Sequence, residues 1–196
     1  VLIELTSGAD ADSLNATMVE ILEAGLEQGL VLDAALAASV ADAQAFWKIR
    51  EEISDAQTRQ GGSIKCDVSV PLSRIADFIA DATDKVLALE PDARMIIYGH
   101  MGDGNVHFNP LRPANQASAS FLKQHYGPIS HAVDELAHAE GGSISAEHGV
   151  GVAKRDDLTR YKSPVELALM WQVKRALDPK NLLNPSKLLP AQNQDF

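Results

Sequence analysis

Two β-rich runs, residues 94–100 and 105–109, flank the glycine-rich segment Met101-Gly102-Asp103-Gly104. Strands joined by so short a connection form an antiparallel hairpin, because parallel strands need a crossover of a dozen or more residues. This hairpin argues against a doubly wound parallel sheet. Since strand and helix patterns alternate along the chain, we expect an α+β fold, with an antiparallel or mixed sheet and helices packed on one face.

Hydrophobic periodicity predicts the remaining elements. Helical spacing of apolar residues occurs at about residues 13–29, 39–60, 73–89 and 164–177, and in a segment expected to be broken near Gly127-Pro128 and to end near residue 140. Short strands are expected at residues 1–6, 30–34, 64–71 and 143–146. Ser163-Pro164-Val165-Glu166 combines an N-cap serine, a proline at the first helical position and a capping-box glutamate.

The composition argues against several kinds of partner and site. With 17 Lys and Arg against 27 Asp and Glu, the net charge of −10 repels phosphate backbones and anionic lipids, so we expect no nucleic-acid partner. Cys66 is the only cysteine, so any metal site must use histidine and carboxylate ligands. A lone thiol is typical of a reducing compartment, and we expect a cytoplasmic location.

The hairpin carries a pair of histidines. If Asp103 and Gly104 form a two-residue turn, His100 and His107 lie directly opposite each other on one face of the sheet. Such residues have Cβ atoms about 4.5–5.5 Å apart, close enough for both imidazoles to bind one metal ion. Asn109, two residues further on, shares that face. The alternative is a pair of surface histidines beside a turn.

A second polar cluster, Glu147-His148, precedes the glycine-rich residues 149–151. Glu147 would complete a His-His-carboxylate ligand set with open positions, which is typical of a catalytic metal. Neighbouring side chains in extended backbone point to opposite sides, so His148 would remain available as an acid or base. The alternative is an exposed loop with two polar residues.

Three further polar residues could bind an anion. Arg50 and Ser54 are four residues apart on one predicted helix, and Lys65 lies in the next predicted strand. Arginine offers a bidentate fork and lysine a point charge, so the three could hold a substrate carboxylate. The alternative is a solvated helix face with ordinary charges.

Three motifs occur in a fixed order, at residues 98–109, 143–151 and 177–187. Together they resemble the C-terminal domain of FAD-linked 2-hydroxy acid dehydrogenases and oxidases. That family has an N-terminal flavin domain of the vanillyl-alcohol oxidase type, followed by a ferredoxin-like α+β substrate domain. Only the second resembles this chain, clearly from about residue 47 to 190 and more loosely before that. We therefore expect residues 1–196 to be this domain and the FAD-binding domain to be absent from the chain. The abrupt, strand-like start at Val1 agrees with a piece of a longer protein.

The resemblance also implies a role for each candidate site residue. His100, His107 and Glu147 would bind a divalent metal, zinc by expectation, and His148 would face both the substrate and the flavin as the catalytic base. Substrate would be held by Asn109 near its C1 carboxylate and by Arg50, Ser54 and Lys65 at a far carboxylate; the family often has threonine where Ser54 stands. Asn184 would lie near the flavin ring.

The implied activity is oxidation of a D-2-hydroxy acid to the 2-keto acid, by metal-assisted hydride transfer to FAD. Residues 50–54 and Lys65 most resemble D-2-hydroxyglutarate dehydrogenases, and this domain would be inactive without its FAD domain. Electrons would leave to an electron-transfer flavoprotein or a quinone, and a homodimer is compatible with the resemblance. The alternatives are a D-lactate dehydrogenase or glycolate oxidase subunit, a non-catalytic ferredoxin-like metal- or ligand-binding module, and a metal-dependent hydrolase.

Overall fold

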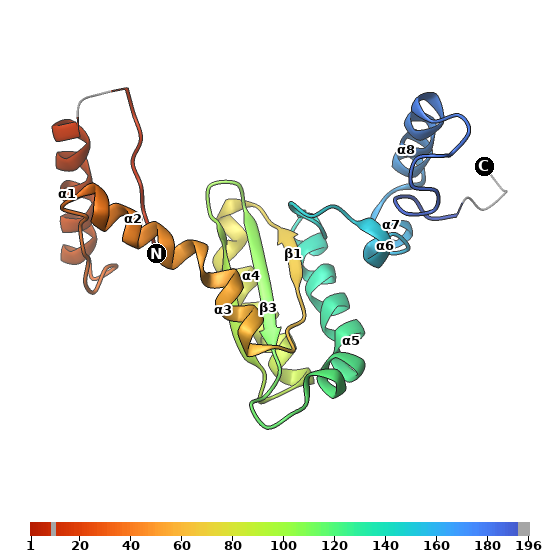
Figure 1. The fold of residues 1–196 in the computed structure, drawn as a ribbon, viewed down its shortest axis with the longest axis horizontal. Coiled ribbons are helices and arrows are strands. Elements are labelled where there is room, and N and C mark those ends of the chain that lie inside the picture. Colours follow the sequence, from red (N-terminus) through yellow and green to blue (C-terminus); the bar gives the residue numbers. More distant parts are fainter. Residues whose placement is uncertain (9–10, 192–196) are drawn as a thin grey trace. The chain divides into compact units, whose positions relative to one another are not determined.

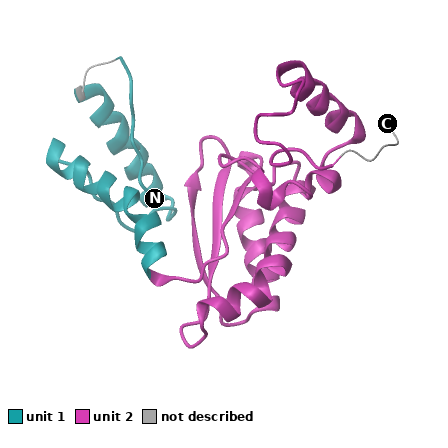
Figure 2. Cartoon of the chain, turned by 45° about the vertical axis from the view of Figure 1, so that its right-hand side comes forward, with its two compact units in different colours: residues 1–59 teal, residues 60–196 magenta. Residues whose placement is uncertain are grey.

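The computed structural model describes residues 1–8 and 11–191. The chain divides into two compact units, residues 1–59 and residues 60–196 (Figure 2). Within the described residues, no helix is long and apolar enough to cross a membrane. The expected α+β class is confirmed, and the sheet lies in the second unit.

Three antiparallel strands form the sheet in the order β1-β3-β2 (Figure 1). They are β1 (Cys66–Ser69), β2 (Arg94–His100) and β3 (Asn105–Leu111), and β2 and β3 make the predicted hairpin. The short strand expected at 143–146 is reduced to an antiparallel bridge between Ser69 and Ser143, on the free edge of β1. This order, with a residual fourth strand beside β1, corresponds to a ferredoxin-like arrangement.

Two helices cover one face of this sheet. Helix α4 (Ile75–Leu89) follows the short 3-10 turn η1 (Leu72–Arg74), and α5 (Ser118–Ala139) packs against both α4 and β1. The core between the helices and the sheet includes Phe78 and Phe108, whose rings meet edge to face at 6.2 Å. The layer of helices predicted on one face is therefore present, and it leaves the other face of the sheet for polar side chains.

Helix α5 is continuous, although we expected a break at Gly127-Pro128. A proline inside a helix removes one backbone hydrogen bond and costs about 3 kcal/mol or more. Here the cost is offset by a stripe of buried side chains four residues apart: Phe121, His125, Ile129, Val133 and Ala137. Because these residues anchor both halves of the helix to the same core, the helix passes through the proline.

The first unit is helical and contains α1 (Ala11–Glu27), α2 (Val40–Glu51) and α3 (Ile53–Gln60), whose last residue lies past the unit boundary. The strands expected at residues 1–6 and 30–34 were wrong, because no described strand pairs with either segment and an extended run needs such a partner. The single helix expected at 39–60 is divided at Glu52.

The second unit ends in three further helices, α6 (Gly151–Lys154), α7 (Leu158–Tyr161) and α8 (Pro164–Leu177). The predicted capping box of α8 is confirmed. The Ser163 hydroxyl accepts the backbone N–H of Glu166 at 3.2 Å, and the Glu166 carboxylate accepts the backbone N–H of Ser163 at 2.9 Å.

Candidate metal centre

The face of the sheet opposite the helices is lined by polar side chains. Cys66 and Val68 point into the core, so Asp67 between them points the other way. The register places Asp67 beside His107 of β3, and His107 beside Tyr98 of β2. One row across three strands therefore presents a carboxylate, an imidazole and a phenol on the same face.

The hairpin register differs from the predicted one. His100 pairs with Asn105 and Tyr98 pairs with His107, so His100 and His107 are diagonal neighbours on one face rather than directly opposed. The connection comprises four residues, 101–104, because His100 and Asn105 form the last pair of the ladder. Within it, the Asp103 carboxylate accepts the backbone N–H of Asn105 at 3.0 Å. Gly104 closes it with a φ of +78°, and a Cβ there would lie 2.2 Å from the carbonyl oxygen of Val70.

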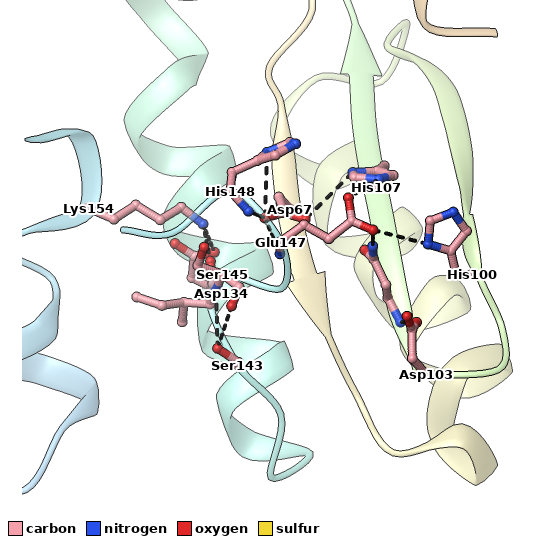
Figure 3. A network of polar contacts seen from close by, with 12 residues as sticks. Asp67, His100, Asp103, His107, Asp134, Ser143, Ser145, Glu147, His148 and Lys154 are labelled. Carbon is pink, nitrogen blue, oxygen red and sulfur yellow. Dashed lines mark hydrogen bonds and ion pairs between the residues drawn. The ribbon is translucent and has the colours of Figure 1, made fainter. Parts of the chain in front are cut away.

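Glu147 joins the two histidines despite their offset (Figure 3). Its Oε1 lies 3.0 Å from Nδ1 of His100, and its Oε2 lies 3.6 Å from Nε2 of His107. The side-chain amide of Asn105 also donates to Oε1 of Glu147. The structure therefore brings together all three residues that we expected to bind a metal.

Asp67 is the residue at this site that the sequence analysis missed. One carboxylate oxygen, Oδ2, accepts the backbone N–H groups of Glu147 at 3.0 Å and of His148 at 2.9 Å. The other, Oδ1, lies 3.6 Å from Nδ1 of His107. The sequence contained a signal for Asp67, because an aspartate between two core residues of a strand must lie on the opposite face of the sheet.

Burial and hydrogen bonding compete at Asp67 and His107. Burial by itself would raise the pKa of Asp67, but the backbone N–H groups of His148 and Glu147, with the nearby imidazoles, hold that pKa below its ordinary value. Burial lowers the pKa of His107, against the opposing effect of Asp67 and Glu147. Both shifts favour a carboxylate beside a neutral imidazole, which are the forms that bind metal ions.

His148 is the most exposed of these side chains, at 63%. Its ring stacks on that of His107, with centroids 5.5 Å apart, and its Nδ1 lies 3.5 Å from Oδ2 of Asp67. Because one face is held by these contacts while most of the ring is accessible, His148 can exchange a proton with a bound molecule.

The loop that carries Glu147 and His148 is fixed from both sides. Ser143 exchanges backbone hydrogen bonds of 2.9 and 3.0 Å with Ser69, and the N–H of Ala146 donates to the carbonyl of Asp67 at 3.2 Å. Further along the chain, Lys154 donates to the carbonyl of Ile144 and to the buried carboxylate of Asp134. A loop without regular structure is thereby held against β1.

The residues expected to bind substrate fall into two groups. Ser63 pairs with Leu111 and Cys66 with Phe108, and this register puts Lys65 opposite Asn109, on the same face as His107. Lys65 is exposed, whereas Asn109 is buried.

Arg50 and Ser54 belong to the other compact unit. The single helix expected to carry both is divided, so Arg50 lies in α2 and Ser54 in α3. The Arg50 guanidinium lies 5.3 Å from the ring centre of Trp47. Their grouping with Lys65 stays a prediction.

Asn184 lies in the segment after α8, with a φ of +49°. It lines a cavity of about 310 Å³, whose other lining residues are Gly151, Lys174, Leu183, Lys187 and Leu188. This cavity is a concave surface near the end of the described chain, and the contact of Asn184 with a flavin stays a prediction.

The donor atoms at the site fit a divalent metal. Oδ1 of Asp67 and Oδ1 of Asn105 are buried and have no hydrogen-bond partner within residues 1–8 and 11–191. Ligand atoms of Asp67, His107 and His148 lie within 4.8 Å of one another. This set shares only His107 with the expected set of His100, His107 and Glu147. Imidazole nitrogens and carboxylate oxygens in such numbers suit zinc.

The chain matches a known protein family over most of its length. The family model described as "FAD linked oxidases, C-terminal domain" matches residues 1–188. The chain is similar to D-2-hydroxyglutarate dehydrogenase, mitochondrial, of Rattus norvegicus, with 38% identity over 193 residues, which cover 98% of this chain and 34% of the relative. The mitochondrial enzyme of the same name in Arabidopsis thaliana is 38% identical over 190 residues, covering 97% and 32% of the two chains.

A bacterial relative shows the same relationship. The D-2-hydroxyglutarate dehydrogenase of Xanthomonas citri pv. viticola is 36% identical over 188 residues, which cover 96% of this chain and 39% of the relative. The chain thus spans about a third of the length of the curated relatives it matches.

Proposed function

Because the chain belongs to the C-terminal domain family of FAD-linked oxidases, we propose that it is the substrate- and metal-binding part of a larger FAD-dependent dehydrogenase. The substrate in this proposal is D-2-hydroxyglutarate or a closely similar D-2-hydroxy acid, which is oxidised to the 2-keto acid. The names of the relatives support this substrate class. The observation that carries the proposal is the contact of Glu147 with both His100 and His107.

Zinc is the metal in this proposal, with His100, His107 and Glu147 as its ligands. A divalent metal held there would supply Lewis acidity, which makes a substrate hydroxyl easier to deprotonate. His148, exposed and stacked beside His107, is the base that accepts the hydroxyl proton. The flavin of the N-terminal FAD-binding domain, when bound, would supply the acceptor for the hydride from C2.

The chain also offers groups for the two carboxylates of such a substrate. Asn109 lies two residues along β3 from His107 on the same face, and in this proposal it hydrogen-bonds the C1 carboxylate. Lys65, opposite Asn109, places a positive charge on that face of an otherwise acidic chain. That Arg50 and Ser54 bind the far carboxylate stays a prediction from the sequence. Asn184 is proposed to lie near the flavin.

Three further properties concern the electron acceptor, the assembly and the location of the protein. We propose an electron-transfer flavoprotein or a quinone as the electron acceptor, a homodimer as the assembly, and a cytoplasmic location. The free thiol of Cys66 is consistent with a reducing compartment. Steady-state assays with each acceptor test the first of these, and light scattering of the purified protein tests whether it is a homodimer.

The test is the reduction of bound flavin in a protein that carries this chain together with a flavin-binding domain. Addition of D-2-hydroxyglutarate should bleach the flavin, and His107→Ala should remove both the bleaching and the zinc. His148→Ala should slow flavin reduction about 10²–10⁴-fold, while zinc stays bound. His131→Ala, on α5 away from the metal-binding residues, is the matched control. Unchanged bleaching in both site variants would refute the proposal.

Substrate choice is tested in the same protein. Faster flavin reduction with D-lactate or glycolate than with D-2-hydroxyglutarate would favour the lactate or glycolate alternative. Lys65→Met should raise the KM for the dicarboxylate far more than for the monocarboxylates, because only the former has a second carboxylate to bind. Equal effects on all three substrates would exclude Lys65 from that role.

A further inference from the structure

The ring of His107 lies between two carboxylates, one at each nitrogen. Nδ1 is 3.6 Å from Oδ1 of Asp67, and Nε2 is 3.6 Å from Oε2 of Glu147. The two acids have different surroundings, because the side chain of Asp67 is 9% exposed and that of Glu147 is 41% exposed. The ring therefore has a buried acid on one side and an accessible acid on the other (Figure 3).

Asp67 is also the more rigid of the two. Its Oδ2 accepts two backbone N–H groups, from Glu147 and His148, and this fixes the plane of the carboxylate. Its Oδ1 is buried and has no hydrogen-bond partner in the part of the chain that the structure describes. Nδ1 of His107 lies 3.6 Å from this oxygen, so a hydrogen on that nitrogen would satisfy it after a small approach of the ring.

A neutral imidazole carries one N–H and one lone pair, and its neighbours decide which nitrogen carries which. A carboxylate only accepts hydrogen bonds, so the nitrogen that faces a fixed, buried carboxylate takes the proton. Glu147 competes less well for a proton at Nε2, because its side chain is 41% exposed and water can hydrogen-bond to the Oε2 that faces this nitrogen. The lone pair of His107 would then point from Nε2 toward Glu147.

We propose that Asp67 is a positioning residue, which holds the proton of His107 on Nδ1 and so presents Nε2 as the metal ligand. The same carboxylate holds the backbone of Glu147 and His148, so one buried acid orients two predicted ligands and the predicted base. Carboxylates that orient a ligating histidine in this way typically change metal affinity about 10–100-fold when removed. The inference rests on the proposed function for its metal, but not for its tautomer.

The competing arrangement makes Asp67 itself a ligand, together with His107 and His148. In that arrangement Nδ1 of His107, which faces Asp67, would carry the lone pair and Nε2 the proton. A metal bound to Asp67 would also compete with the two backbone N–H groups that its carboxylate already accepts. The two arrangements therefore differ in one observable, the position of the proton on His107 in the metal-free chain.

The experiment measures that proton directly. The chain is labelled with ¹⁵N-histidine, stripped of metal and studied by ¹H–¹⁵N correlation NMR at about pH 8, where imidazoles are neutral. His107→Gln identifies the resonances of His107. We expect the proton on Nδ1 in the parent chain. A proton on Nε2 in the parent would overturn the proposal, whether or not any variant folds.

Two variants test whether Asp67 determines which nitrogen of His107 carries the proton. Asp67→Asn can still accept the backbone N–H groups, but its amide donates toward His107, so the proton should move to Nε2 and zinc affinity should fall about 10–100-fold in a calorimetric titration. Asp103→Asn removes the same charge nearby, where asparagine can still accept the Asn105 N–H, and should change neither result. An unchanged tautomer in folded Asp67→Asn would overturn the proposal.

Failure of the proposed function looks different. If the parent chain binds no zinc, the metal site is wrong, but the tautomer of His107 and its response to Asp67→Asn still judge the role of Asp67. If zinc binds while the proton lies on Nε2 of metal-free His107, the metal site stands and the inference falls.

Discussion

His107 pairs with Tyr98 across the hairpin, and their ring centroids are 5.0 Å apart. This pairing places His107 at the centre of the sheet, between Asp67 of β1 and Tyr98 of β2. It depends on a four-residue connection, since a two-residue turn would have opposed His107 to His100. The residues that close the connection therefore decide where the histidines lie.

Gly104→Ala should damage both stability and metal binding. A Cβ at Gly104 would lie 2.2 Å from the carbonyl oxygen of Val70, in a backbone conformation with a φ of +78°. Strain of this kind costs about 1–3 kcal/mol, and the shift of β3 should weaken zinc binding. Urea denaturation and calorimetry measure the two effects.

Gly102→Ala is the control in the same turn. A Cβ built at Gly102 has no atom within 4 Å beyond the glycine itself and its two chain neighbours, so we expect a change within about 0.5 kcal/mol. If the two alanine variants have the same free energy of unfolding and the same zinc affinity, the turn does not set the position of the histidines.

Lys154→Met should be strongly destabilising. The ammonium of Lys154 lies 2.9 Å from Oδ1 of Asp134, a carboxylate that is only 3% exposed. Burial raises the pKa of Asp134 and Lys154 opposes that rise, so the variant leaves a buried acid without its cation. Removing one partner of such a pair costs about 3–5 kcal/mol, to be measured by urea denaturation.

Lys162→Met provides the comparison for that variant. Lys162 pairs at 3.1 Å with Glu166, but both side chains are about half exposed, so the loss should be about 0–1 kcal/mol. Asp134→Asn combined with Lys154→Met should recover part of the stability, because it removes the buried charge. Equal losses of stability in the two lysine variants would show that the Lys154–Asp134 pair contributes no more than an exposed ion pair.

Glu166 should titrate far below an ordinary glutamate. The backbone N–H of Ser163 and the ammonium of Lys162 lower the pKa of Glu166 from 4.5 to about 2. A depressed pKa in the folded state means that this interaction stabilises the fold above pH 4.5 and is lost as the pH falls toward 2. NMR titration of the carboxyl carbon measures it, and Lys162→Met should raise the value. A midpoint near 4.5 in the parent chain would exclude the capping interaction in solution.

Cys66 should be inert to thiol reagents in the folded chain. The residue is 1% exposed, and burial, with a smaller effect of Asp134, raises the pKa of its thiol to about 12. Because the thiolate is the reactive form, Ellman's reagent at about pH 8 should detect no thiol before denaturation and one afterwards. Fast labelling of the native protein would mean that the interface between β1 and α5 opens.

Several features depended only on local patterns, so they could be predicted from the sequence. The hairpin follows from two β-rich runs around a glycine-rich turn, and the start of α8 follows from the Ser163-Pro164-Val165-Glu166 signature. Both involve residues a few positions apart. The pattern of histidines around one turn and of Glu147 near a glycine pair likewise suggested a common site, and these side chains do meet.

Other features required contacts between distant segments. The extended runs at 1–6 and 30–34 are not strands because no described strand pairs with them, and α5 continues through Pro128 because its buried stripe anchors both halves. The length of the hairpin turn depends on Gly104 packing against Val70, which lies far away in sequence.

The sequence by itself determined the α+β class, the hairpin, the N-terminal cap of α8 and the kinds of ligand available at the site. Only the tertiary structure decided the register of His100 against His107 and the place of Asp67 between them and the Glu147 loop. The physical reason is that the hairpin turn packs through Gly104 against Val70, and that Asp67 is held by the backbone of Glu147 and His148. These contacts join segments tens of residues apart, which no local pattern encodes.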